Sequence, residues 1–197
     1  NGQFSQARYF GADYNTNWKA AQARGTRVIN LFKNTYGSQC VRVVATQSAN
    51  YGTATSALDV AKANGGCDAL AIAPYFGGDA KSIGELGAAV QSAIKDMNAN
   101  LQIAKQYGVK LIGYEGGQHL LNLSSADIHY STAMGEAYRL YLAGWLAMPK
   151  ENVGPLCLYD LAEGQSNQQS WGLLRNWTDT SNPRWLAVQA ALPAGLK

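Results

Sequence analysis

Four short apolar runs recur along the chain, and each is nearly continuous rather than alternating. They cover residues 41–46, 69–73, 109–114 and 153–159. A continuous apolar run of this length is typical of a strand that is buried on both faces of a sheet. The pattern therefore predicts four buried strands, and sheets buried on both faces are mostly parallel.

Longer segments with helical periodicity follow the predicted strands, at residues 51–64, 82–107, 128–148 and 183–192. Alternation of strands with helices predicts right-handed crossovers and a parallel α/β sheet, which is either open and doubly wound or closed as a barrel. No dinucleotide glycine fingerprint and no Gly-Lys-Ser phosphate loop follows any predicted strand. This absence counts against an open sheet that binds nucleotides.

The segment before the first predicted strand has helical character but no strand ahead of it. Residues 4–36 are rich in Ala, Gln, Arg and aromatics, and they predict two helical stretches that break near Thr16 and end at Gly37. A barrel of eight β/α units would supply the preceding strand. We therefore expect a single domain that forms the C-terminal half of a TIM barrel, strands five to eight. Residues 1–37 would be the helix after the missing strand four, and residues 38–197 the four β/α units.

Composition fits a folded domain with uncharged partners. The 197 residues are 47% hydrophobic, which is enough for a sizeable core. Only 15% are charged, the net charge is +3, and Lys and Arg are scattered, so no footprint for nucleic acid is visible. No apolar run reaches 18 residues, so we expect no membrane span. Eleven Tyr and five Trp suit stacking on sugar rings, and they equally suit a well-filled core.

The three cysteines and two N-glycosylation sequons do not indicate a particular function. Three cysteines show no metal-ligand spacing. Cys40 and Cys67 each precede a predicted strand and could pair at the amino end of the sheet, whereas Cys157 lies inside a predicted strand and is expected to be a buried thiol. The sequons that begin at Asn122 and Asn176 fit the pattern of N-glycosylation acceptors, whose use depends on the host.

Glu115 is the most informative residue, because it stands where the third apolar run gives way to a Gly-Gly pair. Barrels of the α/β class present catalytic groups at the carboxyl ends of their strands. The alternative is a strand-capping carboxylate paired with a nearby Arg or Lys. Polar residues also follow the other three predicted strands, namely Gln47, Tyr75 and Asp160. Aligned strand ends of this kind predict one wall of a pocket.

With Gly-Tyr-Glu-Gly-Gly at residues 113–117 and Ala-Pro-Tyr-Phe-Gly at residues 73–77, the chain resembles the retaining glycoside hydrolases of clan A. These are (β/α)8 barrels that include cellulases, mannanases and β-glucosidases, and the resemblance covers essentially the whole chain as their C-terminal half. It implies that Glu115 is the catalytic nucleophile and that Tyr75 donates a hydrogen bond to it. It also implies that Trp171 is a platform for a sugar ring.

Elementary chemistry agrees with these roles. A carboxylate that attacks an anomeric carbon must stay ionised, and a tyrosine hydroxyl that donates to it stabilises the charged form. The Gly-Gly pair would let the backbone approach the sugar closely. Gln118 and His119 follow in the same loop and could bind sugar hydroxyls, as could Gln47 and Asp160. Solvation is the alternative for His119, and helix capping is the alternative for Asp160.

One part of the family pattern is missing from the chain. A retaining mechanism needs a second carboxyl group roughly 5–5.5 Å from the nucleophile. The family supplies it from an Asn-Glu pair at the end of strand four, and no such dipeptide occurs here. The opening residues Asn-Gly-Gln-Phe look like sequence that follows this pair, so the general acid/base is expected upstream of Asn1.

The resulting expectation is a retaining glycoside hydrolase that cleaves β-glycosidic bonds in a polysaccharide or oligosaccharide outside the cell. It would need no cofactor and no metal. It would act beside an N-terminal half-barrel chain or a second copy of itself, because an isolated half-barrel exposes sheet edges and apolar faces. The alternative is a non-catalytic carbohydrate-binding or inactive half-barrel fragment. A serine hydrolase is disfavoured, since no Gly-x-Ser-x-Gly elbow occurs.

Overall fold

The computed structural model describes residues 14–162 and 171–193, and its centre is a parallel sheet of four strands. The strands lie in the order β1 (Val43–Gln47), β2 (Ala69–Ala73), β4 (Lys110–Gly113) and β6 (Val153–Leu156). The predicted parallel α/β sheet is therefore confirmed. Each of these strands lies next to the one before it in the chain, and the order runs in one direction across the sheet. Right-handed crossovers between strands in such an order place their helices on one face of the sheet.

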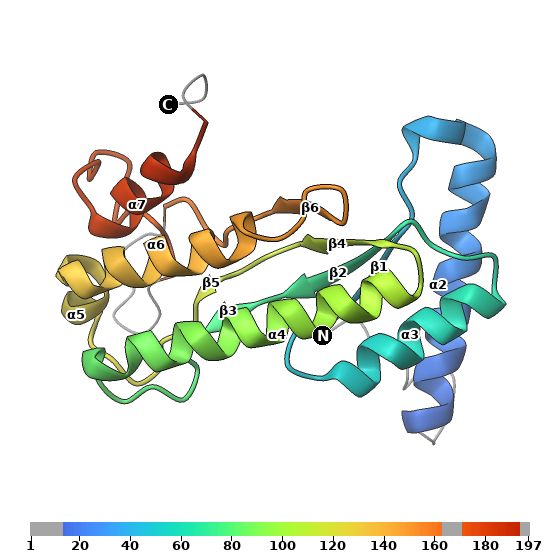
Figure 1. Ribbon diagram of the computed structural model, residues 1–197, viewed down its shortest axis with the longest axis horizontal. Helices are drawn as coiled ribbons and strands as arrows, with labels where there is room; N and C mark the ends of the chain where they lie inside the picture. The colour runs from blue at the N-terminus through green and yellow to red at the C-terminus, as the bar shows by residue number, and fades with distance from the viewer. Residues whose placement is uncertain (1–13, 163–170, 194–197) are drawn as a thin grey trace.

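The main helices form a row in which each packs on the next. Figure 1 shows α2 and α3 at one end of the row, α4 running along the sheet, and α6 and α7 at the other end. The bounds are α2 (Tyr14–Tyr36), α3 (Tyr51–Ala63), α4 (Leu86–Gln106), α6 (Thr132–Leu146) and α7 (Pro183–Ala191). Three short elements complete the described helices: α5 (Ser125–Tyr130) and the 3-10 turns η1 (Gly37–Gln39) and η2 (Ile83–Glu85).

The core lies between the sheet and this helical row. Val44, Leu70 and Leu111 occupy neighbouring positions in the register of β1, β2 and β4, and each is at most 2% exposed. The opposite face of β1 behaves differently, because Ala45 and Gln47 are exposed. Burial on both faces is thus confirmed for β2 and is wrong for β1, whose outer edge has no strand partner among the described residues.

Most predicted elements are confirmed to within a few residues. α2 is continuous from Tyr14 to Tyr36, so the chain does not break at Thr16 itself, and the first of the two stretches predicted within residues 4–36 lies largely outside the described residues. The helix ends as expected before Gly37, whose φ of +58° is the left-handed conformation that glycine adopts easily. The predicted helix at residues 128–148 is divided, because Ser131 caps α6 by accepting a hydrogen bond from the N–H of Ala133.

Two expectations about the cysteines are wrong. Cys40 and Cys67 are free thiols and do not form a disulfide. Cys157 is exposed rather than buried: it lies one residue beyond the end of β6, and its N–H still donates to the carbonyl of Gly113 at 2.9 Å. In the part of the chain that the structure describes, no helix has the length and apolar character needed to cross a membrane.

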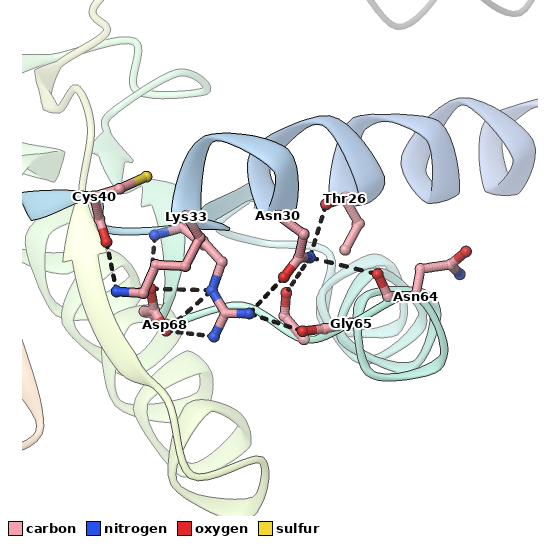
Figure 2. Close-up of polar contacts among 9 residues, drawn as sticks. Thr26, Asn30, Lys33, Cys40, Asn64, Gly65 and Asp68 are labelled. Carbon is pink, nitrogen blue, oxygen red and sulfur yellow. Dashed lines mark hydrogen bonds and ion pairs between the residues drawn. The ribbon is translucent and has the colours of Figure 1, made fainter. Parts of the chain in front are cut away.

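A polar network ties α2 to the amino ends of the first two strands (Figure 2). Arg42 donates through Nη2 and Nε to the Asp68 carboxylate, at 2.6 Å and 3.2 Å from Oδ1. Its Nη1 donates to Asn30 Oδ1 and to the carbonyl of Gly65, both at 2.7 Å. Lys33 Nζ donates to the carbonyl of Cys40 at 2.7 Å and lies 3.6 Å from Asp68 Oδ2. We refer to Asn30, Lys33, Arg42 and Asp68 as the amino-end network.

Candidate active site

Two short strands that the sequence did not reveal bring Glu115 and Tyr75 together. β3 (Tyr75–Phe76) and β5 (Gly117–Gln118) pair in parallel just beyond the carboxyl ends of β2 and β4, with Tyr75 opposite Gly117. The N–H of Tyr114 donates to the carbonyl of Ile72 at 3.1 Å, which continues the pairing to the residue before Glu115. The loops after the two strands are therefore held in register at the edge where parallel barrels place their chemistry.

Glu115 is half-buried and keeps its carboxylate free. It forms no hydrogen bond and no ion pair with any residue in 14–162 or 171–193. The strand-capping alternative, in which an Arg or Lys neutralises it, is thus not found in these ranges. A half-buried carboxylate without a partner is unusual in a structural role, because its desolvation is not compensated.

Tyr75 lies close enough to Glu115 to respond to its charge. Burial raises the pKa of the Tyr75 hydroxyl, and the negative charge of Glu115 raises it further. The same two causes raise the pKa of Tyr114. No hydrogen bond joins the Tyr75 hydroxyl to the Glu115 carboxylate in this structure. The two side chains are therefore neighbours, as the resemblance implied, without the direct bond that it also implied.

Tyr75 begins a row of rings that crosses the carboxyl ends of the strands. Its ring centroid lies 5.5 Å from that of His119, which lies 5.8 Å from Trp171 with planes 22° apart. Tyr159 follows at 6.1 Å from Trp171 in an edge-on arrangement. We call these four residues the aromatic row. Rows of this kind offer flat apolar surfaces on which the C–H faces of sugar rings stack.

A hydrogen bond within the row fixes the tautomer of His119. Trp171 Nε1 donates to His119 Nδ1 at 3.2 Å. An indole N–H can only donate, so Nδ1 must be the acceptor and the neutral imidazole carries its proton on Nε2. His119 thereby keeps one N–H donor available at its other ring nitrogen. The predicted residues Tyr75, His119 and Trp171 therefore lie together, although Trp171 is 52 residues from His119 in the sequence.

The remaining predicted residues are more dispersed. Gln118 is 1% exposed, and its Oε1 accepts the N–H of Leu120 at 2.7 Å, so its side chain orders the loop from within. Gln47 is exposed at the end of β1, which is separated from β4 by β2. Asp160 is half-buried, and its Oδ1 is buried without a hydrogen-bond partner among the described residues.

The Gly-Gly pair after Glu115 packs against two tyrosines of α6. A Cβ on Gly116 would lie 2.5 Å from the Tyr141 hydroxyl, and one on Gly117 would lie 2.9 Å from the Tyr138 hydroxyl. Both tyrosines are fully buried on α6, and Tyr138 also accepts the N–H of Gln118 at 3.2 Å. The glycines are therefore needed because the loop packs tightly on α6, which fixes the path of the chain behind Glu115.

A cleft of about 440 Å³ adjoins Tyr75 on the side away from β5. Its walls are the loop at residues 76–80, the residue Ala49 that follows β1, and one face of α4. Three carboxylates line it, from Asp79, Glu85 and Asp96, and no Lys or Arg does. Asp96 accepts a hydrogen bond from the Tyr51 hydroxyl, and Glu85 accepts from the N–H of Lys81 at 2.9 Å. No pattern in the sequence indicates this cleft, because its walls come from three separate segments.

Comparison with known proteins adds no assignment. No protein-family model matches the sequence, and no curated protein matches it significantly. Among the described residues, no group of three or more His, Cys, Asp or Glu side chains could hold a metal ion. What the site can do must therefore be inferred from Glu115, the aromatic row and the cleft.

Proposed function

We propose that the chain carries the nucleophile of a retaining glycoside hydrolase that cleaves β-glycosidic bonds in a polysaccharide or oligosaccharide. The observation that carries the proposal is the unpaired, half-buried carboxylate of Glu115 at the carboxyl end of β4, beside Tyr75 and the aromatic row. A nucleophilic carboxylate must be ionised and accessible to the substrate, and an ion pair with Arg or Lys would reduce its nucleophilicity.

The chain itself holds the nucleophile of the proposed chemistry, and the general acid/base is expected from outside it. The Glu115 carboxylate would attack the anomeric carbon and form a glycosyl ester while the bond to the leaving oxygen breaks and the general acid protonates that oxygen; the same group, then acting as a base, would activate the water that hydrolyses the ester. A bound sugar displaces water and draws neighbouring groups together, so the Tyr75 hydroxyl would then donate to the carboxylate. Rings of the aromatic row would support the sugar faces, and the cleft beside Tyr75 would hold a further sugar unit, whose hydroxyls can donate to its carboxylates.

We further propose that the sheet is the second half of a (β/α)8 barrel. Sequential strand order with one helical row is the arrangement of half a closed barrel. The outer edge of β1 is unpaired among described residues. Beside it, α2 exposes an apolar stripe at helical spacing, made of Val28, Leu31, Phe32 and Tyr36, which are 42–66% exposed.

A partner that covers both features would bring a strand to β1 and a helix to α2, as a preceding β/α unit does. That unit would also bring the general acid, roughly 5–5.5 Å from Glu115. This preceding β/α unit would belong to an N-terminal half-barrel. The alternative partner for the edge of β1 and the stripe on α2 is a second copy of this chain. Native mass spectrometry of the purified protein distinguishes a partner of similar mass from a homodimer or a lone chain.

A carbohydrate-binding protein without catalysis is the second candidate. The aromatic row favours it, because stacking on sugar rings needs neither a nucleophile nor an acid. In that case Glu115 would serve as a hydrogen-bond acceptor for a sugar hydroxyl. Substitution Glu115→Gln would then change affinity for oligosaccharides and leave no activity to lose.

The decisive experiment removes the need for the general acid. A 2,4-dinitrophenyl 2-deoxy-2-fluoro-β-glycoside has a leaving group that departs without protonation, so a working nucleophile is labelled even when the acid is absent. We expect the glucoside, mannoside or xyloside to add one glycosyl mass to the peptide that contains Glu115. Glu115→Gln should abolish labelling, and the exposed Glu151→Gln should leave it unchanged. Binding of oligosaccharides without labelling by any of the three probes would favour the second candidate.

A further inference from the structure

Asn176 is half-buried and lies in a turn whose next two residues are exposed. Its Oδ1 accepts the Thr178 hydroxyl at 2.7 Å and the Thr178 N–H at 3.0 Å. Its carbonyl accepts the N–H of Asp179 at 3.1 Å, which closes the turn. The middle residue, Trp177, is 73% exposed, and Thr178 is exposed as well. The Nδ2 of Asn176 has no hydrogen-bond partner in the described part of the chain.

This geometry points to Asn176 as an acceptor of an N-linked glycan, donated by a lipid-pyrophosphate-linked oligosaccharide. Such an acceptor needs an Asn followed two residues later by Ser or Thr, on the protein surface. The hydrogen bond from the Thr178 hydroxyl draws electron density toward Oδ1 and makes the Nδ2 protons more acidic. In the transfer, Nδ2 forms a bond to the anomeric carbon of the donor. The bond from that carbon to the phosphate oxygen breaks, the lipid pyrophosphate leaves with the electron pair, and the transferase base takes the proton from Nδ2.

The other sequon, at Asn122, can be compared with the one at Asn176, because its Asn and Ser side chains already form hydrogen bonds with other residues. Asn122 Nδ2 donates to the carbonyls of Gly78 and Ala80, at 3.5 Å and 3.4 Å. Its Ser124 caps α5, with Oγ donating to Asp127 Oδ2 at 2.6 Å and accepting the N–H of Asp127 at 3.1 Å. A glycan on Asn122 would replace one of the two Nδ2 hydrogens, so the two hydrogen bonds to the loop after β3 could not both remain.

The two sequons also differ in how much of the fold they need. The bonds between Asn176 and Thr178 span two residues, so they form in a nascent chain as readily as in a folded one. The contacts of Asn122 span 42–44 residues and exist only after folding. Asn176 is therefore presented both before and after folding, whereas folding withdraws Asn122.

Secretion of the chain from a eukaryotic host tests the assignment. The chain is expressed behind a secretion signal as wild type, N122Q, N176Q, T178S and T178A, together with a reporter glycoprotein. We expect a glycan at Asn176 on the wild type, N122Q and T178S, with a higher occupancy than at Asn122, and none at residue 176 on N176Q or T178A. Peptide-N-glycosidase should convert residue 176 to Asp in the mass spectrum of its peptide.

Secreted amounts and circular dichroism spectra check that each variant folds. A secreted wild-type chain with an unmodified Asn176, beside a glycosylated reporter, overturns the assignment. An occupancy at Asn122 that equals or exceeds the occupancy at Asn176 overturns the distinction between the two sequons. Neither result depends on whether Glu115 is a nucleophile.

Discussion

Charged side chains are paired at the amino ends of the strands, whereas Glu115 at the carboxyl ends is not paired within residues 14–162 and 171–193. At the amino ends, Arg42 makes hydrogen bonds to Asp68, Asn30 and a backbone carbonyl, and Lys33 lies beside the same carboxylate. At the carboxyl ends, Glu115 is half-buried and meets no cation in the described ranges. Paired charges hold elements together, whereas an unpaired carboxylate contributes nothing to stability. The difference separates an end where charged groups pair across elements from an end where Glu115 has no partner among the described residues.

The largest effect should come from removing Arg42. Arg42→Ala leaves Asp68 and Asn30 without their main partner in a region where both side chains of the pair are largely covered. We expect a loss of about 2–4 kcal/mol in the free energy of unfolding, measured by urea denaturation. The control is Arg139→Ala, whose pair with Glu136 is more than half exposed, and it should leave the free energy of unfolding nearly unchanged. Equal losses in the two variants would mean that the amino-end network is not a structural anchor.

The Gly117→Ala substitution tests how firmly the loop behind Glu115 is fixed. Gly117 has a φ of +127°, which is strained for alanine, and the new Cβ would press on the Tyr138 hydroxyl. We expect a loss of about 2–3 kcal/mol in thermal or urea unfolding. Gly108→Ala is the matched control, because its φ is +69° and a Cβ there meets nothing within 4 Å. At Gly108 only backbone strain should lower the free energy of unfolding, by about 1 kcal/mol. A similar loss at both positions would show that the Tyr138 side chain moves to make room for the new Cβ.

Acid should weaken the amino-end network. The hydrogen bond from Arg42 is the main cause that holds the pKa of Asp68 at about 2, below its usual value near 4. Asp68 therefore contributes its full stabilisation above about pH 4, and this contribution is lost as the pH falls toward 2. Because the Asp68 side chain is 31% exposed, we expect the loss to be about 1–2 kcal/mol. Urea unfolding between pH 5 and 2 should show this slope in the wild type and a smaller one in Arg42→Ala.

The sequence predicted what depends on local pattern, and missed what depends on tertiary contact. The β2 strand was predicted to the residue, because its apolar run is continuous and the strand is covered on both faces. The pairing of β3 with β5 was missed, since two-residue strands carry no periodicity. Glu115 could be recognised from its place after an apolar run. Contact between His119 and Trp171 crosses 52 residues, and only the resemblance to a family proposed Trp171 at all.

The smallest effect on stability should come from Glu115 itself. Glu115→Gln keeps the shape of the side chain and removes a charge that has no partner among the described residues. We expect the free energy of unfolding to change by no more than about 0.5 kcal/mol, in either direction. A loss above about 1 kcal/mol would reveal a cation supplied from outside the described ranges, and the strand-capping interpretation would then replace the catalytic one. Unchanged stability together with lost labelling by the fluoroglycoside is the combination that only a nucleophile produces, because a structural carboxylate cannot be removed without cost.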